Sequence, residues 1–112
     1  MASEFSERVI SLLKRVPKGK VVTYGALAAY AGNPRGARQV VRVINTYWER
    51  EKLPWHRVIN REGKISLAPG QGYELQKAKL KAEGARFDKA DRVDLERCLW
   101  IPRKVSHRAS RP

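Results

Sequence analysis

Cys98 is the single thiol in a chain of 112 residues, and a thiolate is the strongest nucleophile that an ordinary side chain supplies. One cysteine can form neither an internal disulfide nor a cysteine-rich metal site. We expect no metal and no other cofactor. A reducing compartment suits a chain with one cysteine. Cys98 lies far along the chain from the other candidate residues, and we interpret it as a free thiol without a chemical role.

Cationic side chains are the second chemical feature, because 24 Lys and Arg face 11 Asp and Glu and give a net charge of +13. Between Lys14 and Lys64 there are 12 basic and 3 acidic residues, whereas the segment from Arg86 to Arg97 has four of each. A basic excess concentrated in one half of a small chain favours a polyanion, with solubility alone as the alternative. Nucleic acid is therefore the expected partner.

Membranes and export are not indicated. The chain has no apolar run of about 18 residues, and its N-terminus lacks a basic region leading into a hydrophobic stretch. A basic amphipathic helix with an aromatic face is also missing. We expect a monomer inside the cell, in the cytoplasm or nucleoid, associated with DNA and not with a membrane.

The elements that would position a DNA-contacting surface lie in the first half of the chain. Apolar spacing predicts a helix over residues 4–16. After an extended Val21–Val22, Thr23 resembles the N-cap of a helix over 24–31, and Gly32-Asn33-Pro34 ends it. A third helix is predicted over 35–47 with an apolar stripe of Ala37, Val40, Val41 and Ile44. Two short helices joined by this turn make a helix-turn-helix candidate, with an ordinary helical hairpin as the alternative.

The second half is predicted to complete a small α/β domain that is mainly α and of winged helix-turn-helix type. Residues 58–59 and 65–67 would form a small hairpin, or wing, around Asn60–Lys64. A helix is predicted over 72–83, and residues 86–87 with 93–100 would form a last hairpin. We expect one domain over 1–102 and a basic, disordered tail over 103–112.

Three segments resemble the DNA-binding domain of O6-alkylguanine-DNA alkyltransferases, and the resemblance covers about residues 4–84. They read VPKGKVVTYG from Val16, AGNPRGAR from Ala31 and LPWHRVIN from Leu53. In the transferases the last segment reads Pro-Cys-His-Arg, and its Cys accepts the alkyl group. Here Trp55 occupies that position, which is the mark of the alkyltransferase-like proteins.

The resemblance implies that the residues supporting catalysis are kept while the nucleophile is lost. His56 matches the family's His, and Glu83 matches the Glu behind it that helps to deprotonate the thiol. Helical spacing places Glu83 on one face with Tyr73, Gln76 and Leu80, so it can turn inward. Because an indole does not displace an alkyl group at neutral pH, the chain is expected to bind the lesion without enzymatic repair.

The resemblance also implies how the lesion would be bound. Tyr24 would push on the backbone so that O6-alkylguanine rotates out of the duplex, and Arg38 would fill the vacated stack. Trp55 would form an aromatic wall of the pocket. The implied DNA-contacting residues are Tyr24, Ala37, Arg38 and Gln39, and the implied pocket comprises Tyr24, Pro54, Trp55, His56, Arg57, Val58 and Ile59, supported by Asn60 and Glu83. Arg57 would hold structure or phosphate more than base.

Two positions depart from the transferase pattern. Val41 replaces a Gly where the third helix nears the minor groove, so it is either buried on the apolar stripe or lifts the helix. Ala68 lies where some relatives carry an Arg near the bound base.

The family implies a minor-groove complex with duplex DNA and hand-over to nucleotide excision repair proteins. The alternatives are a winged-helix transcription regulator, a transferase using Cys98, and a base-removing glycosylase.

Overall fold

The computed structural model describes residues 3–102, and its first element is the helix α1, Glu4–Arg15. The side chain of Ser3 caps it by accepting a hydrogen bond from the backbone N–H of Ser6. Its buried residues are Val9, Ile10, Leu12 and Leu13. The predicted tail, 103–112, lies outside the described residues.

The two helices of the predicted helix-turn-helix follow as α2, Tyr24–Tyr30, and α3, Ala37–Tyr47. Thr23 caps α2 as predicted, because its hydroxyl accepts a hydrogen bond from the N–H of Ala26 at 3.0 Å. Gly32 follows with a φ of 102°, which favours glycine and lets the chain turn. The helix α3 begins two residues later than predicted, with Gly36 at its N-cap packed against Asn33 and Phe5.

The sheet is different from the predicted wing. Strand β1, Val22–Thr23, pairs in parallel with β2, Val58–Ile59, so that Val22 lies opposite Val58. The predicted pairing of 58–59 with 65–67 is therefore wrong. Residues 60–64 instead form a tight turn in which the N–H of Asn60 donates to the carbonyl of Lys64 at 3.0 Å. Strand β2 pairs with β1, which is far away in the sequence, and this pairing buries Val22, Val58 and Ile59 in the core.

The remaining elements are a 3₁₀ turn η1, Trp55–Arg57, and the helices α4, Tyr73–Ala82, and α5, Leu95–Cys98. The predicted last hairpin is only partly correct. Phe87 and Val93 do form an antiparallel bridge, but residues 95–98 are helical and Leu99 bridges in parallel to Val21. Two apolar clusters result, one among α1, α2 and α3 and one around Val21, Ile59 and Leu80.

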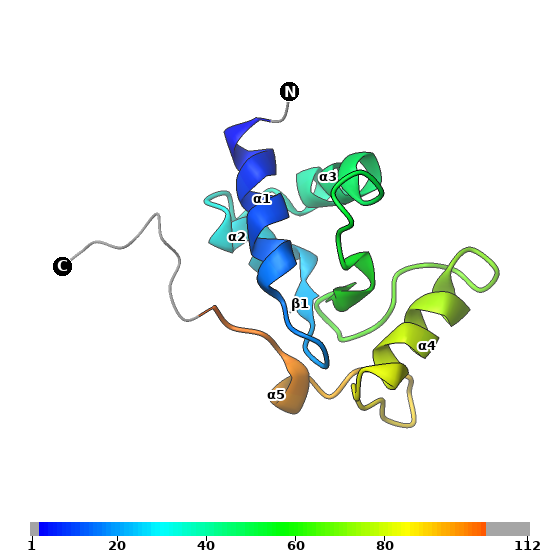
Figure 1. Ribbon diagram of the computed structural model, residues 1–112. Coiled ribbons are helices and arrows are strands. Elements are labelled where there is room, and N and C mark those ends of the chain that lie inside the picture. Colours follow the sequence, from blue (N-terminus) through cyan, green and yellow to red (C-terminus); the bar gives the residue numbers. More distant parts are fainter. Residues whose placement is uncertain (1–2, 103–112) are drawn as a thin grey trace.

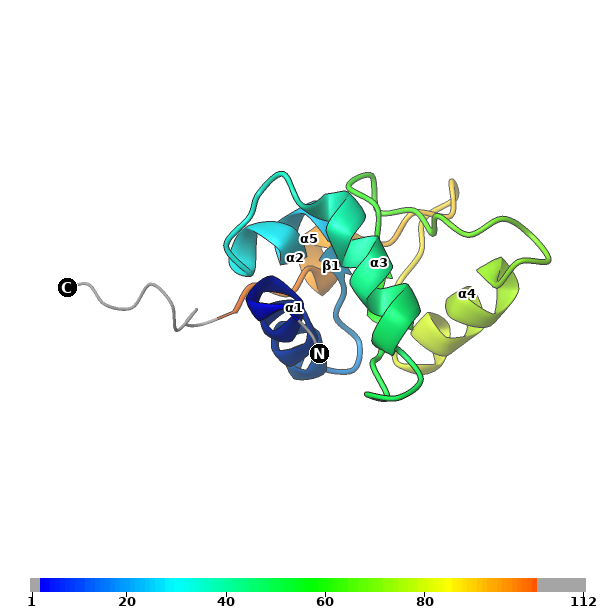
Figure 2. The same ribbon diagram turned by 90° about the horizontal axis from the view of Figure 1, so that it is seen from above.

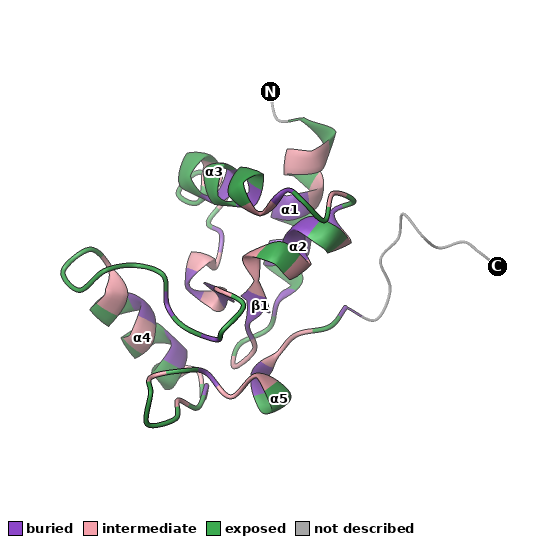
Figure 3. Cartoon of the chain, turned by 180° about the vertical axis from the view of Figure 1, so that it is seen from behind, coloured by how far each residue is buried: buried purple, intermediate pink, exposed green. Residues whose placement is uncertain are grey.

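The arrangement leaves α3 and α4 with free outer surfaces. Figure 1 shows α1, α2 and α3 packed together in the upper part of the molecule, with β1 below them and α4 and α5 lower still. Seen from above, α3 lies between α1 and α4 (Figure 2). Exposed residues cover the outer turns of α3 and α4, whereas buried residues line their inner sides (Figure 3). None of the helices formed within residues 3–102 is long and apolar enough to cross a membrane.

Candidate lesion-binding site

A charged cluster joins η1 to the end of α4. Glu83 accepts from Arg57 Nε at 2.9 Å with one oxygen and from Arg57 Nη2 at 2.7 Å with the other. That second oxygen also lies 2.9 Å from His56 Nε2. Arg57 Nη1 donates to the carbonyl of Val16 at 2.8 Å, which ties in the end of α1. Arg57 thus has a structural role, which is one of the two roles, structure or phosphate, that the sequence analysis left open.

The protonation states of this cluster follow from its contacts. The guanidinium of Arg57 lowers the pKa of Glu83 from 4.5 to about 2, so the carboxylate is ionised and can only accept. Burial lowers the pKa of His56, although the hydrogen bond to Glu83 works against that shift. A neutral His56 must therefore carry its proton on Nε2 and donate it to Glu83. In this form His56 leaves Nδ1 as an acceptor, but no thiol is beside it.

A cavity of about 290 Å³ lies between α3 and α4. Tyr24 and Trp55, the two aromatic residues assigned to the lesion from the sequence, both line it. The rest of its lining comes from the end of α3, the segment before α4 and the first turn of α4: Ile44, Asn45, Trp48, Leu67, Gln71, Gly72, Leu75 and Gln76. A mostly apolar concavity with a few neutral polar groups is typical of a small-molecule or base pocket.

Tyr24 and Trp55 each lie next to one of the two paired strands, and both line the cavity. Tyr24 begins α2 directly after β1, and Trp55 begins η1 directly before β2. Tyr24 is half-buried, and this burial raises the pKa of its hydroxyl, which stays protonated at neutral pH. Trp55 packs edge-on against the His56 ring, with 6.1 Å between centroids. The indole therefore lies between the cavity and the His56–Glu83 pair.

Gln76 on α4 is a site residue that the sequence did not single out as lining the cavity. It is 2% exposed, and its amide nitrogen donates to the carbonyls of His56 and Val58, both at 2.9 Å. These bonds fix the backbone on both sides of Arg57. Trp48, Leu67 and Leu75 were also missed, because a sequence gives no signal for which apolar residues stay partly exposed.

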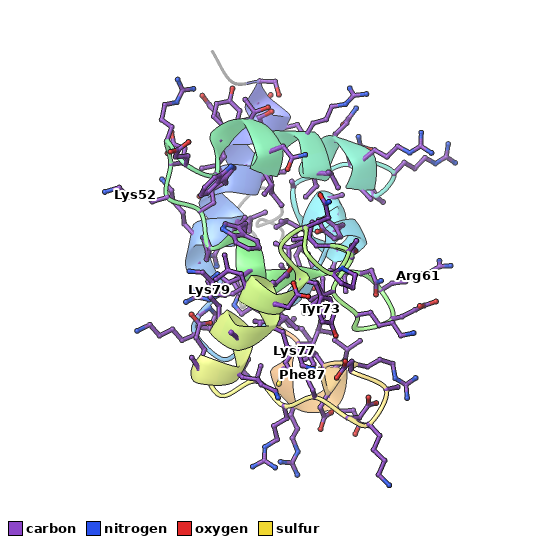
Figure 4. The ribbon with its side chains drawn as sticks, turned by 90° about the vertical axis from the view of Figure 1, so that its right-hand side faces the viewer. Lys52, Arg61, Tyr73, Lys77, Lys79 and Phe87 are labelled. Carbon is purple, nitrogen blue, oxygen red and sulfur yellow. The ribbon has the colours of Figure 1, made fainter. Side chains whose placement is uncertain are left out.

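The outer side of α4 is held by Asp91. Tyr73 donates its hydroxyl hydrogen to one Asp91 oxygen at 2.7 Å, and Lys77 Nζ donates to the other at 2.8 Å. Lys77 also lies 5.7 Å from the centre of the Phe87 ring (Figure 4). These contacts of Asp91 help to hold α4, the helix that contributes Leu75 and Gln76 to the cavity.

The residues assigned to DNA on α3 are presented outward. Arg38 and Gln39 are exposed and Ala37 is partly buried. Val41 is 39% exposed, and Val43 takes the buried position beside Val40 and Ile44. The predicted apolar stripe was therefore wrong at Val41, which shares the exposed face with Arg38, Arg42 and Asn45.

The other pocket residues assigned from the sequence do not line the cavity. Val58 and Ile59 are buried in β2, and Pro54 precedes η1. Asn60 organises its own turn, since its side-chain oxygen accepts from the N–H groups of Glu62 and Lys64 at 2.9 Å. The roles assigned to these residues toward a base stay predictions.

The sequence of this chain is similar to known DNA-binding proteins. Residues 4–85 match the family described as the 6-O-methylguanine DNA methyltransferase, DNA binding domain. The chain belongs to this family. A DNA base-flipping protein of Escherichia coli is 44% identical over 96 residues, which cover 86% of this chain and 74% of the relative. Alkyltransferase-like protein 1 of Schizosaccharomyces pombe is 36% identical over 104 residues, covering 88% and 96%.

A solved structure of this methyltransferase-related family shares the architecture. It is S. pombe Atl1 in complex with damaged DNA containing O6-carboxymethylguanine. It superimposes with a TM-score of 0.76 at 35% identity and covers 91% of this chain and 100% of its own. The mainly helical fold is therefore that of the alkyltransferase-like branch as well as of the methyltransferase DNA-binding domain.

Proposed function

We propose that this protein binds O6-alkylguanine in duplex DNA, holds the flipped base in the cavity between α3 and α4, and does not repair it. The observation that carries the proposal is the position of Trp55. It lines the cavity and packs on His56, which is bonded to Glu83, so a histidine–glutamate pair is retained without a thiol to activate.

Cys98 supports the non-enzymatic conclusion. It is 4% exposed and packs with Val21, Ile59 and Leu80 in the second apolar cluster, and it is not among the cavity-lining residues. A thiol buried in this cluster and away from the cavity cannot reach the alkyl group of a base bound there. The transferase alternative that uses Cys98 therefore has no support.

DNA would approach from the exposed face of α3, with Arg38 inserted into the stack and Tyr24 beside the cavity pressing on the displaced nucleotide. The names of the relatives, a base-flipping protein and a complex with damaged DNA, support this course. Approach through the minor groove and hand-over to nucleotide excision repair proteins are further expectations that come from the family alone.

The test compares binding to one duplex carrying either guanine or O6-methylguanine at a single position. We expect tighter binding to the lesion, and Arg38→Ala should weaken lesion binding by about 1–3 kcal/mol, the size of one stacked or bidentate base contact. Arg86→Ala is the matched control, since it removes the same charge from an exposed site outside α3. Equal affinity for both duplexes would instead favour a winged-helix regulator.

A fluorescent base analogue beside the lesion reports unstacking in the same titration. If Arg38→Ala and Tyr24→Phe leave both the fluorescence change and the affinity at wild-type values, the assignment of these two residues to flipping is wrong.

A further inference from the structure

The open end of the cavity between α3 and α4 is unusually apolar for a surface. Among residues 3–102, five large hydrophobic side chains are exposed, and three of them line this one cavity. They are Trp48 at 44%, Leu67 at 36% and Leu75 at 54% exposure. Scattered exposed apolar residues need no explanation, but three gathered at one concavity mark a place where an apolar group binds.

The three residues come from separate elements that are held in place. Trp48 follows α3, Leu75 lies in the first turn of α4, and Leu67 lies in the segment that joins the 60–64 turn to α4. Gly72 has a φ of 114°, and a Cβ there would come within 2.9 Å of Leu67 Cδ1. Glycine at this position therefore lets Leu67 pack closely against the start of α4.

Charge is absent from the same surface. None of the ten described residues that line the cavity is charged, and its polar side-chain groups are neutral: those of Tyr24, Asn45, Gln71 and Gln76 and the indole N–H groups of Trp48 and Trp55. An ionised group that entered would lose hydration without gaining an ionic partner, which is unfavourable. A neutral alkyl group would lose little and would bury apolar surface.

We infer that Trp48, Leu67 and Leu75 receive the alkyl group of the flipped base and select neutral, apolar O6-alkyl groups over anionic ones. This inference rests on the proposed function and adds the substrate class and three specificity-determining residues. Carboxymethyl, the alkyl group in the S. pombe Atl1 complex, is the informative anion. O6-isobutyl is its neutral counterpart, because both groups have the same number and branching of non-hydrogen atoms.

The experiment measures the affinity of the full chain for three otherwise identical duplexes, carrying guanine, O6-isobutylguanine or O6-carboxymethylguanine. We expect both lesions to bind more tightly than guanine, and isobutyl to bind on the order of tenfold more tightly than carboxymethyl. Equal affinity for the two lesions, or a preference for carboxymethyl, would overturn this inference and leave lesion recognition standing. If neither lesion binds more tightly than guanine, the proposed function fails.

A charge placed in the cavity should reverse the preference. Leu75→Lys should lower the ratio of isobutyl to carboxymethyl affinity toward or below one, because the ammonium group gives the carboxylate a partner. Ile101→Lys is the control, since Ile101 is 68% exposed, lies outside the cavity and gains the same charge. Added attraction to phosphates affects both lesions equally, so the ratio isolates the cavity. A ratio that changes equally in both variants would contradict the assignment of Leu75.

Discussion

The hydrogen bonds of Glu83 show why a histidine–glutamate pair persists beside a tryptophan that cannot react. Through Arg57 and His56 the carboxylate connects α4, η1 and the carbonyl that ends α1. The side chains of Arg57 and Glu83 are only 13% and 15% exposed, so loss of one partner would leave the other charge poorly solvated. The cluster is therefore part of what holds the fold together.

Glu83→Gln should lower the free energy of unfolding at neutral pH by about 2 kcal/mol, the value of a charged hydrogen-bond pair with some solvent access. The pKa of Glu83 is lowered by folding from 4.5 to about 2. Its contribution to stability is therefore complete above pH 4.5 and is lost as the pH falls toward 2. The variant should show a shallower loss of stability over this range.

Urea unfolding at a series of pH values measures the effect. Glu62→Gln removes an exposed carboxylate from the 60–64 turn and serves as the control with an unchanged slope. If Glu83→Gln and wild type lose stability in parallel between pH 4.5 and 2, the ion pair contributes nothing to the fold.

At the scale of elements, α3 presents Arg38, Val41, Arg42 and Asn45 on one exposed face. Its inner side, with Val40, Val43 and Ile44, packs in the cluster formed with α1 and α2. Because this inner side is held in the core, we expect α3 to keep its position when its exposed face contacts DNA. Val41 is the apolar residue at the centre of that face.

Val41→Glu should weaken binding to damaged and undamaged duplexes alike, by roughly tenfold, because a carboxylate would face phosphates. Stability should change by no more than about 0.5 kcal/mol, since the residue is exposed. Ile101→Glu gives the same change of side chain away from α3 and should have a smaller effect. Fluorescence anisotropy on both duplexes, with thermal unfolding alongside, decides whether Val41 lies in the interface.

The same helix shows where sequence reasoning reaches its limit. Spacing and capping residues predicted the first helix over 4–16, the Thr23 cap of α2 and a helix over 72–83, because these segments carry helical periods and capping residues. Val41 and Val43 fit an apolar stripe equally well, and only packing against α1 and α2 selects Val43. Strand β2 was given the wrong partner because two residues have no period, and the true partner lies far back in the chain.

The site divides in the same way. The resemblance to the transferases implied that His56 and Glu83 lie together and that Tyr24 and Trp55 share one pocket, and the structure has both features. The part of the cavity made by Trp48, Leu67 and Leu75 depends on how α4 lies against α3, which no local pattern records.

At the scale of the whole molecule, the property that bears on DNA binding is the large positive net charge. The net charge of +13 gives an attractive field that does not depend on sequence or damage. The exposed Arg61 points away from the body of the molecule on the 60–64 turn (Figure 4). Binding should therefore combine a general electrostatic part with a lesion-dependent part supplied by the cavity.

Affinity for undamaged duplex should fall steeply as salt rises, because each neutralised phosphate releases counterions. The difference in binding free energy between lesion and guanine duplexes should change much less, since stacking in the cavity releases none. Titrations at several salt concentrations separate the two parts. If the affinity for undamaged duplex does not change with salt, duplex DNA is not the main target. If the free-energy difference between lesion and guanine duplexes falls with salt as steeply as the affinity for undamaged duplex, stacking does not account for that difference.

Mass spectrometry of both components tests most directly whether the lesion is bound without being removed. Excess protein is incubated with a duplex containing O6-methylguanine, and the protein and the nucleosides are then analysed separately. With Trp55 on the cavity and Cys98 buried, we predict unmodified protein and the full amount of O6-methylguanine still in the strand. A methyl group on any residue, or free O6-methylguanine released from the strand, would contradict the proposal that the lesion is bound without being repaired.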